Sequence, residues 1–164
     1  MLDFQNWYVL FVQTGKEETL CSLLKDSFVY PFSAKFEFYK RVNQKIDKKA
    51  LFPGYIFCLS NLDQDAFDEW LRKKPVKKGL IKELKYDQMN ALTKEEILIL
   101  NHLLNDKGIL TMSKGRKVAG KFQIVEGPLV GMDAYIVKYD SQHKLATLDL
   151  FFLNQQWKAG IIEI

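Results

Sequence analysis

The stretch WYVLFVQTGKEE (Trp7–Glu18) decides how the chain begins to fold. Its apolar half, Trp7–Gln13, is too short for a buried helix and is typical of a strand that is covered on both faces. Thr14 and Glu17 then match a capping box, in which two side chains satisfy backbone amides at the start of a helix. We therefore expect a strand followed by a helix over about 16–28. The apolar face of this helix comprises Leu20, Cys21, Leu24 and Phe28.

Further strand and helix signals continue to about residue 108. Phe36–Tyr39 alternates as a half-exposed strand, and the lysine-rich segment 41–49 is expected to be a mobile loop or a hairpin tip. Pro53 and Gly54 then form a turn that leads into a buried strand. Two helices with N-terminal caps are expected afterwards, and an α+β sandwich is the fold class that this order favours. The expected caps are Asp63 for the first helix, and Thr93 with Glu96 for the second, which ends near Gly108.

A different pattern begins at Leu110. Residues 112–117 are polar and have the profile of a flexible linker. Turn signals then separate five short segments of strand character. Five short strands in about fifty residues favour a small closed β-barrel, because closure removes exposed sheet edges. The expected strands lie near Phe122–Val125, Ala134–Tyr139, Ala146–Phe152, Gln156–Lys158 and Ile161–Ile164.

Composition narrows the class of protein. The chain has 164 residues, of which 48% are hydrophobic and 27% charged, so it should fold as a globular protein. It has no apolar run long enough to cross a bilayer and no signal peptide, and Cys21 and Cys58 lack a CxxC spacing. These features predict a cytoplasmic protein without membrane contact, in which both cysteines are buried free thiols.

The sequence contains no pattern that indicates catalysis. A nucleophile elbow, a phosphate-cradling glycine loop and metal-ligand spacings are all missing. His102 and His143 belong to no triad or metal set. We therefore expect no enzymatic activity, no catalytic residue, no metal and no cofactor.

Positive charge is concentrated in two clusters. Six basic residues and two acids lie between Lys35 and Lys49, and seven basic residues and one acid lie between Arg72 and Lys85. Such clusters attract nucleic-acid phosphates or an acidic protein surface, but they are also common on solvated faces. Composition leaves these alternatives open.

Three segments, taken in order, carry a resemblance to a known family. They are WYVLFVQTGKEE (Trp7–Glu18), LFPGYIF (Leu51–Phe57) and GKFQIVEGPLVGMDAYIVKYD (Gly120–Asp140). The first two resemble the opening strand and the FPGY signature of the N-terminal (NGN) domain of NusG-family transcription elongation factors. The third resembles a KOW motif, with its glycines at Gly127 and Gly131. The resemblance implies an NGN-like domain over 5–108, a linker over 109–119 and a KOW β-barrel over 120–164, in a monomeric protein.

The resemblance also implies an aromatic surface that binds the clamp helices of RNA polymerase. Residues of this kind at a strand entrance suit a partner's helical hairpin, although ordinary core packing is the alternative interpretation. We expect Phe52 and Tyr55 to be the best anchors. The full predicted polymerase-binding set is Trp7, Tyr8, Phe11, Phe52 and Tyr55.

Basic residues of the expected barrel are candidates for contact with nascent RNA. They alternate with aromatic residues on which bases stack, but acidic residues in the same region leave protein contact as an alternative. The predicted RNA-binding set is Lys114, Arg116, Lys117, Lys121, Lys138, His143, Lys144 and Lys158.

One part of the barrel is similar to a specialised branch of the family. The spacing of Lys138, Asp140 and Lys144 is similar to the KxDxxxK turn of LoaP-type antiterminators, which implies that an RNA hairpin is bound. The segment Phe152–Asn154 replaces the FGR turn of ordinary NusG proteins, which brings contact with a ribosomal small-subunit protein or Rho into doubt. General NusG function and a polymerase-independent RNA-binding or ribosome-associated module remain the alternatives.

Overall fold

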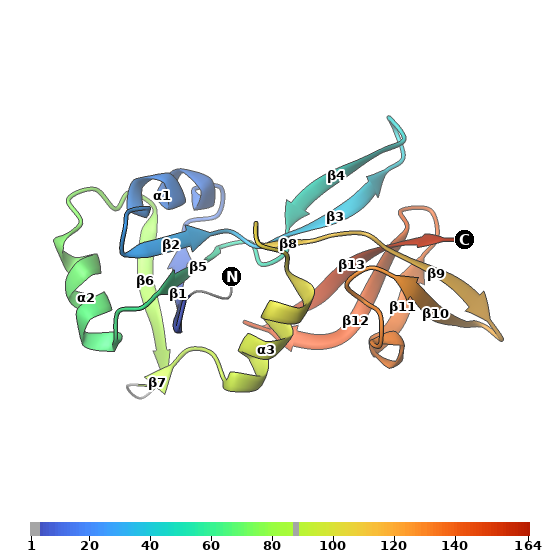
Figure 1. Cartoon of the computed structure of the whole chain (residues 1–164). Coiled ribbons are helices and arrows are strands. Elements are labelled where there is room, and N and C mark those ends of the chain that lie inside the picture. The colour runs from blue at the N-terminus through green and yellow to red at the C-terminus, as the bar shows by residue number, and fades with distance from the viewer. Residues whose placement is uncertain (1–3, 87–88) are drawn as a thin grey trace. The chain divides into compact units, whose positions relative to one another are not determined.

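The computed structural model of the chain describes residues 4–86 and 89–164, and no side chain of residues 86–90 is described. These residues form two compact units, which are described separately below (Figure 1). Unit 1 comprises Met1–Ser33 and Pro53–Asn101, and unit 2 comprises Ala34–Phe52 and His102–Ile164. The units therefore divide the chain at places other than the domain boundaries expected from sequence, and residues 34–52 belong to unit 2.

Unit 1 is built on a five-stranded sheet in the order β2-β5-β1-β6-β7. The apolar run at the start of the chain is its central strand, as predicted. β1 pairs antiparallel with β5 on one side and with β6 on the other. The strands are β1 (Asn6–Val12), β2 (Val29–Phe32), β5 (Tyr55–Ser60), β6 (Leu80–Tyr86) and β7 (Met89–Asn90).

Two helices contribute to the core of unit 1. They are α1 (Glu17–Leu24) and α2 (Gln64–Lys73), and a third helix, α3 (Lys94–Leu103), crosses the boundary between the units. Cys21 and Cys58 lie in this core as buried free thiols, as predicted. None of the described helices is long and apolar enough to cross a membrane. The core comprises Tyr8, Leu10, Val12, Leu20, Cys21, Leu24, Val29, Ile56, Cys58, Phe67 and Leu71.

The predicted caps of two helices are confirmed. The Asp63 carboxylate accepts a hydrogen bond of 2.9 Å from the Ala66 amide at the start of α2. Thr93 and Glu96 form a reciprocal capping box before α3, because each side chain accepts from the other residue's amide, at 2.9 and 3.1 Å. Both helices therefore begin where the capping pattern predicted.

The first helix begins near residue 16 as predicted, but its expected cap and its expected end were wrong. Glu17 Oε1 accepts from the amide of Gly15, so Thr14 does not form the expected capping box. At the other end, the Asp26 carboxylate accepts from the amides of Phe28 and Val29 and turns the chain after Leu24. Phe28 consequently leaves the apolar face and is 58% exposed.

Three strands of unit 1, β2, β6 and β7, were not predicted. β2 contains Pro31, which lacks an amide proton and so weakened its strand signal, but β2 is an edge strand, where proline is tolerated. β6 lies within the second basic cluster, whose charge masked its alternation. Sequence analysis therefore gave unit 1 fewer strands than it has.

Unit 2 contains a three-stranded sheet, β4-β3-β8, and a five-stranded sheet, β10-β9-β13-β12-β11. The segment around 41–49 is a hairpin, because β3 and β4 pair antiparallel with Lys40 opposite Lys45. The strands are β3 (Lys35–Lys40), β4 (Lys45–Ala50), β8 (Ile109–Leu110), β9 (Ser113–Val118), β10 (Lys121–Glu126), β11 (Ile136–Asp140), β12 (Leu145–Phe152) and β13 (Gln155–Glu163).

The five-stranded sheet has the predicted number of strands, but three assignments were wrong. Residues 113–118 were expected within a linker and instead form β9, which pairs with β10 and β13. Its inward residues are Ser113 and Gly115, which are too small to give an apolar alternation. The two expected strands at the C-terminus are one strand, β13, and residues 133–135 form a 3₁₀ turn, η1, before β11. The predicted α+β fold class is confirmed.

Candidate functional sites

One face of the unit 1 sheet is rich in aromatic residues. Residues opposite each other in an antiparallel pair project to the same face, and side chains alternate along each strand. The register therefore places Trp7, Phe11 and Tyr55 of the predicted set on one face, because Phe11 lies opposite Tyr55 and Trp7 opposite Leu59. Further members of this aromatic face are Tyr30, Phe32 and Phe57.

Phe11 and Tyr55 are the half-buried end of this face. Their ring centroids are 5.4 Å apart, and neither side chain is fully covered. Gly54 precedes Tyr55 with a φ of +88°, a value that strongly favours glycine. The Gly54 carbonyl accepts from the Val12 amide at 2.8 Å, so the Pro-Gly turn fixes the start of β5 beside the end of β1.

Trp7 is covered by aromatic neighbours on the same face. It is 2% exposed and makes edge contacts with Phe32 and Phe57 at 5.8 and 5.9 Å. Tyr30 lies further along this face at the sheet edge and is half-buried, with its ring 6.3 Å from that of Phe32. Sequence analysis missed Tyr30 because it missed β2, although a VYPF segment has strand composition.

Two of the predicted polymerase-binding residues do not join this face. Tyr8 points to the opposite face, where it stacks on Phe67 at 3.9 Å and its hydroxyl donates to the Leu62 carbonyl at 2.5 Å. Burial, and then nearby carboxylates, raise the pKa of Tyr8 to about 12. Phe52 belongs to unit 2, is 1% exposed and packs against Phe152 and Trp157 at 5.1 and 5.2 Å. Both side chains are core residues in this structure, which corrects the expectation that Phe52 is an exposed anchor.

Two carboxylates and a lysine connect α2 with β6 in unit 1. Gln64 Nε2 donates to Asp68 Oδ1 and to Glu83 Oε1, each at 2.8 Å, and Lys85 Nζ lies 2.6 Å from Asp68 Oδ2. Burial, together with a hydrogen bond to Asp68, raises the pKa of Glu83 to about 7. The pKa of Asp68 is lowered, because its hydrogen bonds to Glu83, Lys85 and Gln64 outweigh the effect of burial.

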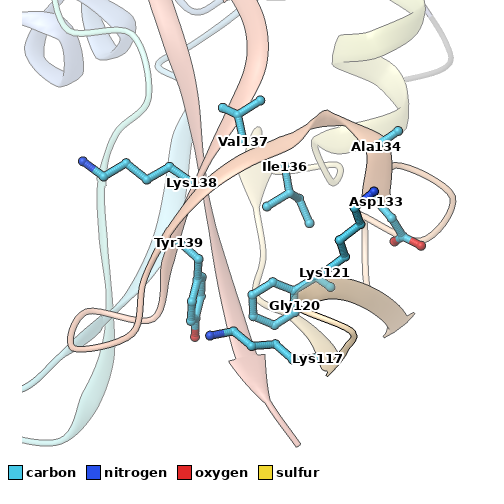
Figure 2. Close-up of a pocket in the computed structure, with 10 residues that line it drawn as sticks. Lys117, Gly120, Lys121, Asp133, Ala134, Ile136, Val137, Lys138 and Tyr139 are labelled. Atoms are coloured by element: carbon cyan, nitrogen blue, oxygen red, sulfur yellow. The ribbon is translucent and has the colours of Figure 1, made fainter.

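Unit 2 contains a pocket at the two edge strands of its five-stranded sheet (Figure 2). The pocket has a volume of about 610 Å³. Phe122 of β10 meets Tyr139 of β11 edge to face at 4.6 Å, so the sheet curls until its two edges are in contact through side chains. The lining residues are Lys117, Gly120, Lys121, Phe122, Asp133, Ala134, Ile136, Val137, Lys138 and Tyr139.

Three of the predicted RNA-binding residues, Lys117, Lys121 and Lys138, line this pocket. Lys117 Nζ lies 5.6 Å from the Phe122 ring centroid and 5.4 Å from that of Tyr139, which is cation–π range. The Asp133 carboxylate accepts from the Ile124 amide at 3.1 Å, so it is occupied by the backbone. The pocket therefore combines lysine ammonium groups with aromatic rings.

Two further predicted residues, His143 and Lys144, lie in the turn between β11 and β12. Asp140 organises this turn: its Oδ1 accepts from the amides of Gln142 and His143, and its Oδ2 lies 2.6 Å from His143 Nδ1. The contact with His143 lowers the pKa of Asp140. Lys144 has a φ of +51° and extends its ammonium over the Tyr39 ring, 5.3 Å from the centroid. The aspartate of the KxDxxxK spacing thus has a structural role in shaping the turn.

The remaining predicted basic residues are not gathered at the pocket. Lys114 Nζ lies 3.6 Å from Glu126, and Lys158 Nζ donates to Thr147 Oγ1 at 2.8 Å. Arg116 is exposed on β9, where strand alternation places it on the face opposite to that of Lys117. Five of the eight predicted residues therefore lie at the pocket or in the β11–β12 turn.

Comparisons with known proteins agree with this architecture. A family model described as transcription termination factor nusG matches residues 5–101. The transcription termination/antitermination protein NusG of Campylobacter jejuni subsp. jejuni serotype O:2 is 27% identical over 177 residues, covering 98% of this chain and 96% of that protein. A solved structure concerned with domain interaction in Thermotoga maritima NusG is similar in fold, with a TM-score of 0.52, 15% identity and coverage of 93% of this chain and 90% of that one.

Proposed function

Because the chain belongs to the NusG family of transcription factors, we propose that it is an elongation and antitermination factor that binds RNA polymerase through unit 1 and nascent RNA through unit 2. The aromatic face of unit 1 is the observation that best supports the proposed contact with polymerase. Half-buried aromatic side chains beside a rigid turn are the residues that most often anchor a protein interface. Phe11 and Tyr55 meet this description, with Tyr30 as an addition from the structure.

In the proposed mechanism, the factor acts on the polymerase by binding rather than by catalysis. A protein that binds the closed, elongating polymerase more tightly than the paused enzyme shifts the equilibrium toward elongation, and only by its differential affinity. The clamp helices are the proposed partner of the aromatic face. No step in this mechanism requires a catalytic residue, a metal or a cofactor.

The proposed RNA contact is made by unit 2. Lys117, Lys121 and Lys138 supply ammonium groups for phosphates, and Phe122 and Tyr139 supply rings beside them. Single-stranded or looped RNA is bound by this combination of charge and stacking. A LoaP-like preference for an RNA hairpin is the specialised form of this proposal, supported by the Lys138–Lys144 spacing.

Tyr55→Ala tests the polymerase contact. An interface anchor of this kind contributes about 1–2 kcal/mol or more, so the variant should bind polymerase at least about fivefold more weakly and shorten pauses less. Phe28→Ala is the matched control, because it removes a 58% exposed aromatic side chain of unit 1 that lies outside the sheet strands.

Purified polymerase, the full chain and a paused template provide the assay, with thermal unfolding as a check that both variants fold. If Tyr55→Ala binds polymerase as the unaltered chain does, the aromatic face is not the docking surface. If the full chain at saturating concentration neither binds polymerase nor changes pausing, a polymerase-independent RNA-binding module becomes the better explanation.

General NusG function is the second candidate. It is favoured by the alignment with the Campylobacter protein along nearly the whole length of both chains. In this case unit 2 binds a ribosomal small-subunit protein or Rho instead of RNA. Binding of the full chain to either protein, together with no measurable affinity for an RNA stem-loop, would favour it.

A further inference from the structure

The β3–β4 hairpin carries a dense cluster of positive charge in unit 2. Residues 40–49 contain five basic residues and one acid, Asp47, and every residue from 41 to 49 is exposed. Asp47 lies 3.8 Å from Lys40. The hairpin therefore has a large excess of positive charge in solvent, which the fold of unit 2 does not need.

The base of this hairpin is fixed on the five-stranded sheet. The Met112 amide donates to Glu37 Oε1 of β3 at 2.8 Å. On β13, Gly160 leaves room for the backbone of β3, because a Cβ there would lie 2.7 Å from the Glu37 carbonyl oxygen. These contacts hold the hairpin as part of unit 2 and leave its distal end, Lys40, Arg41 and Lys45, in solvent.

The hairpin also meets the β11–β12 turn. Lys144 Nζ lies over the ring of Tyr39, and Tyr39 immediately precedes Lys40. Lys40 and Lys45 lie directly opposite each other in the hairpin register. The β11–β12 turn therefore touches the hairpin through Tyr39, while strand alternation directs Lys40 and Lys45 to the other face of the hairpin.

The pairing of Lys40 with Lys45 is unfavourable for folding. Like charges directly opposite in an antiparallel pair are destabilising, by up to about 1 kcal/mol. A bound polyanion reverses the sign of this contribution, because each ammonium then faces a phosphate. Residues 40–49 hold five basic side chains against two exposed large apolar ones, Val42 and Ile46, so charge complementarity favours a polyanion over an apolar protein surface.

We propose that the distal end of the β3–β4 hairpin and the β11–β12 turn together hold phosphate groups of the RNA helix that unit 2 binds. This inference rests on the proposed RNA contact and extends it to Lys40, Arg41 and Lys45, for which the sequence left nucleic acid, an acidic protein surface and solvent as alternatives. Lys144 is the residue that joins the two parts of the site.

A hairpin variant with Lys40→Gln, Arg41→Gln and Lys45→Gln tests the proposal. Its matched control carries Lys73→Gln, Lys78→Gln and Lys94→Gln, which remove the same charge from exposed positions of unit 1. The probes are a perfectly paired RNA stem-loop and a DNA stem-loop of the same sequence. Binding to the full chain is measured by fluorescence anisotropy over a series of salt concentrations, after circular dichroism has shown that each variant is folded.

The hairpin variant should bind the RNA at least about tenfold more weakly, and the slope of log K against log salt should flatten by about 0.9 for each phosphate that is no longer neutralised. Lys144→Gln should flatten this slope by about 0.9, because it removes one ammonium group. The control variant should stay within about twofold of the unaltered chain. Polymerase binding should be the same for all of these variants.

Three results would overturn the inference. If the unaltered chain binds RNA and the hairpin variant binds it equally well, the hairpin is not part of the site and the proposed function stands. If neither protein binds the RNA stem-loop, the RNA contact itself is wrong. If the hairpin variant loses affinity for the DNA stem-loop alone, the ligand of the hairpin is a DNA duplex.

Discussion

Gly160→Ala is the sharpest test of how the β3–β4 hairpin is attached to unit 2. The added Cβ would lie 2.7 Å from the Glu37 carbonyl oxygen and 2.9 Å from Met112 Cε, whereas ordinary contact begins near 3.4 Å. The Met112 side chain is flexible and can move aside. The Glu37 carbonyl belongs to the backbone of β3, so β3 must move away from β13.

The expected cost of this movement follows from the interactions that it strains. Overpacking by one methyl group typically costs about 1–3 kcal/mol when backbone must shift. The hydrogen bond of 2.8 Å from the Met112 amide to the Glu37 carboxylate weakens at the same time and adds about 1 kcal/mol. We therefore expect the variant to destabilise the attachment of the hairpin by about 2–4 kcal/mol.

Native-state hydrogen exchange is the suitable assay, because a chain of two units need not unfold in one transition. Amides of β3 and β13 should exchange about 30-fold faster or more, as a destabilisation of about 2 kcal/mol requires. Amides of β1 in unit 1 serve as the internal control and should keep their rates. Unchanged exchange in β3 would refute the close packing of β3 on β13.

A second variant separates the two neighbours of the added methyl group. Adding Met112→Ala to Gly160→Ala removes the flexible neighbour but leaves the Glu37 carbonyl in place. Protection of β3 should therefore recover only in part. Complete recovery would mean that the methionine side chain alone limits the space, and that the backbone of β3 lies farther from β13 than described.

Two other substitutions test local energetics. The pKa of Glu83, about 7 in the folded chain against the ordinary value of 4.5, means that the native state holds an extra proton between these pH values, so stability falls as pH rises through this window. Glu83→Gln should therefore increase the free energy of unfolding by about 1–3 kcal/mol more above pH 7 than below pH 4.5, which thermal unfolding at the two pH values measures. An equal gain at the two pH values would contradict the assigned pKa. Leu153 has a φ of +53° in the β12–β13 turn, a conformation that asparagine tolerates better than leucine. Leu153→Asn should therefore stabilise unit 2 by about 0.5–1 kcal/mol, measured by thermal unfolding. A loss of stability would show that packing of the leucine side chain outweighs the backbone strain.

The sequence predicted elements well where several local signals agreed. The apolar run Trp7–Gln13 became β1, and the caps at Asp63 and Thr93 lie where the pattern placed them. The prediction at Thr14 failed because Gly15 follows with a φ of +94°, so the chain makes a turn before the helix begins. A capping box is a local pattern, and a neighbouring glycine can satisfy the same carboxylate, as the bond from Gly15 to Glu17 shows.

Predictions of the candidate sites depended on which face each side chain takes. The sequence grouped Trp7, Phe11 and Tyr55 as aromatic residues at a strand entrance, and the register places all three on one face. Tyr8 is their neighbour in sequence but necessarily points to the opposite face, so grouping it with them ignored the period of two. Phe52 lies three residues before Tyr55, yet the chain passes from unit 2 to unit 1 between Phe52 and Pro53. Only tertiary structure reveals such a division.

The proposed RNA site of the hairpin differs from these cases, because folding and binding place opposite demands on its residues. Lys40 and Lys45 face each other across exposed strands, where an opposite charge at either position would stabilise the hairpin. Sequences normally agree with their fold at every level, and the places where they do not are often functional. The same pair becomes favourable once a phosphate lies between or beside the ammonium groups. Such a pair of like charges lowers the stability of the free chain, and binding of a phosphate restores that stability. The charge pattern of the hairpin therefore indicates its role, whereas its packing does not.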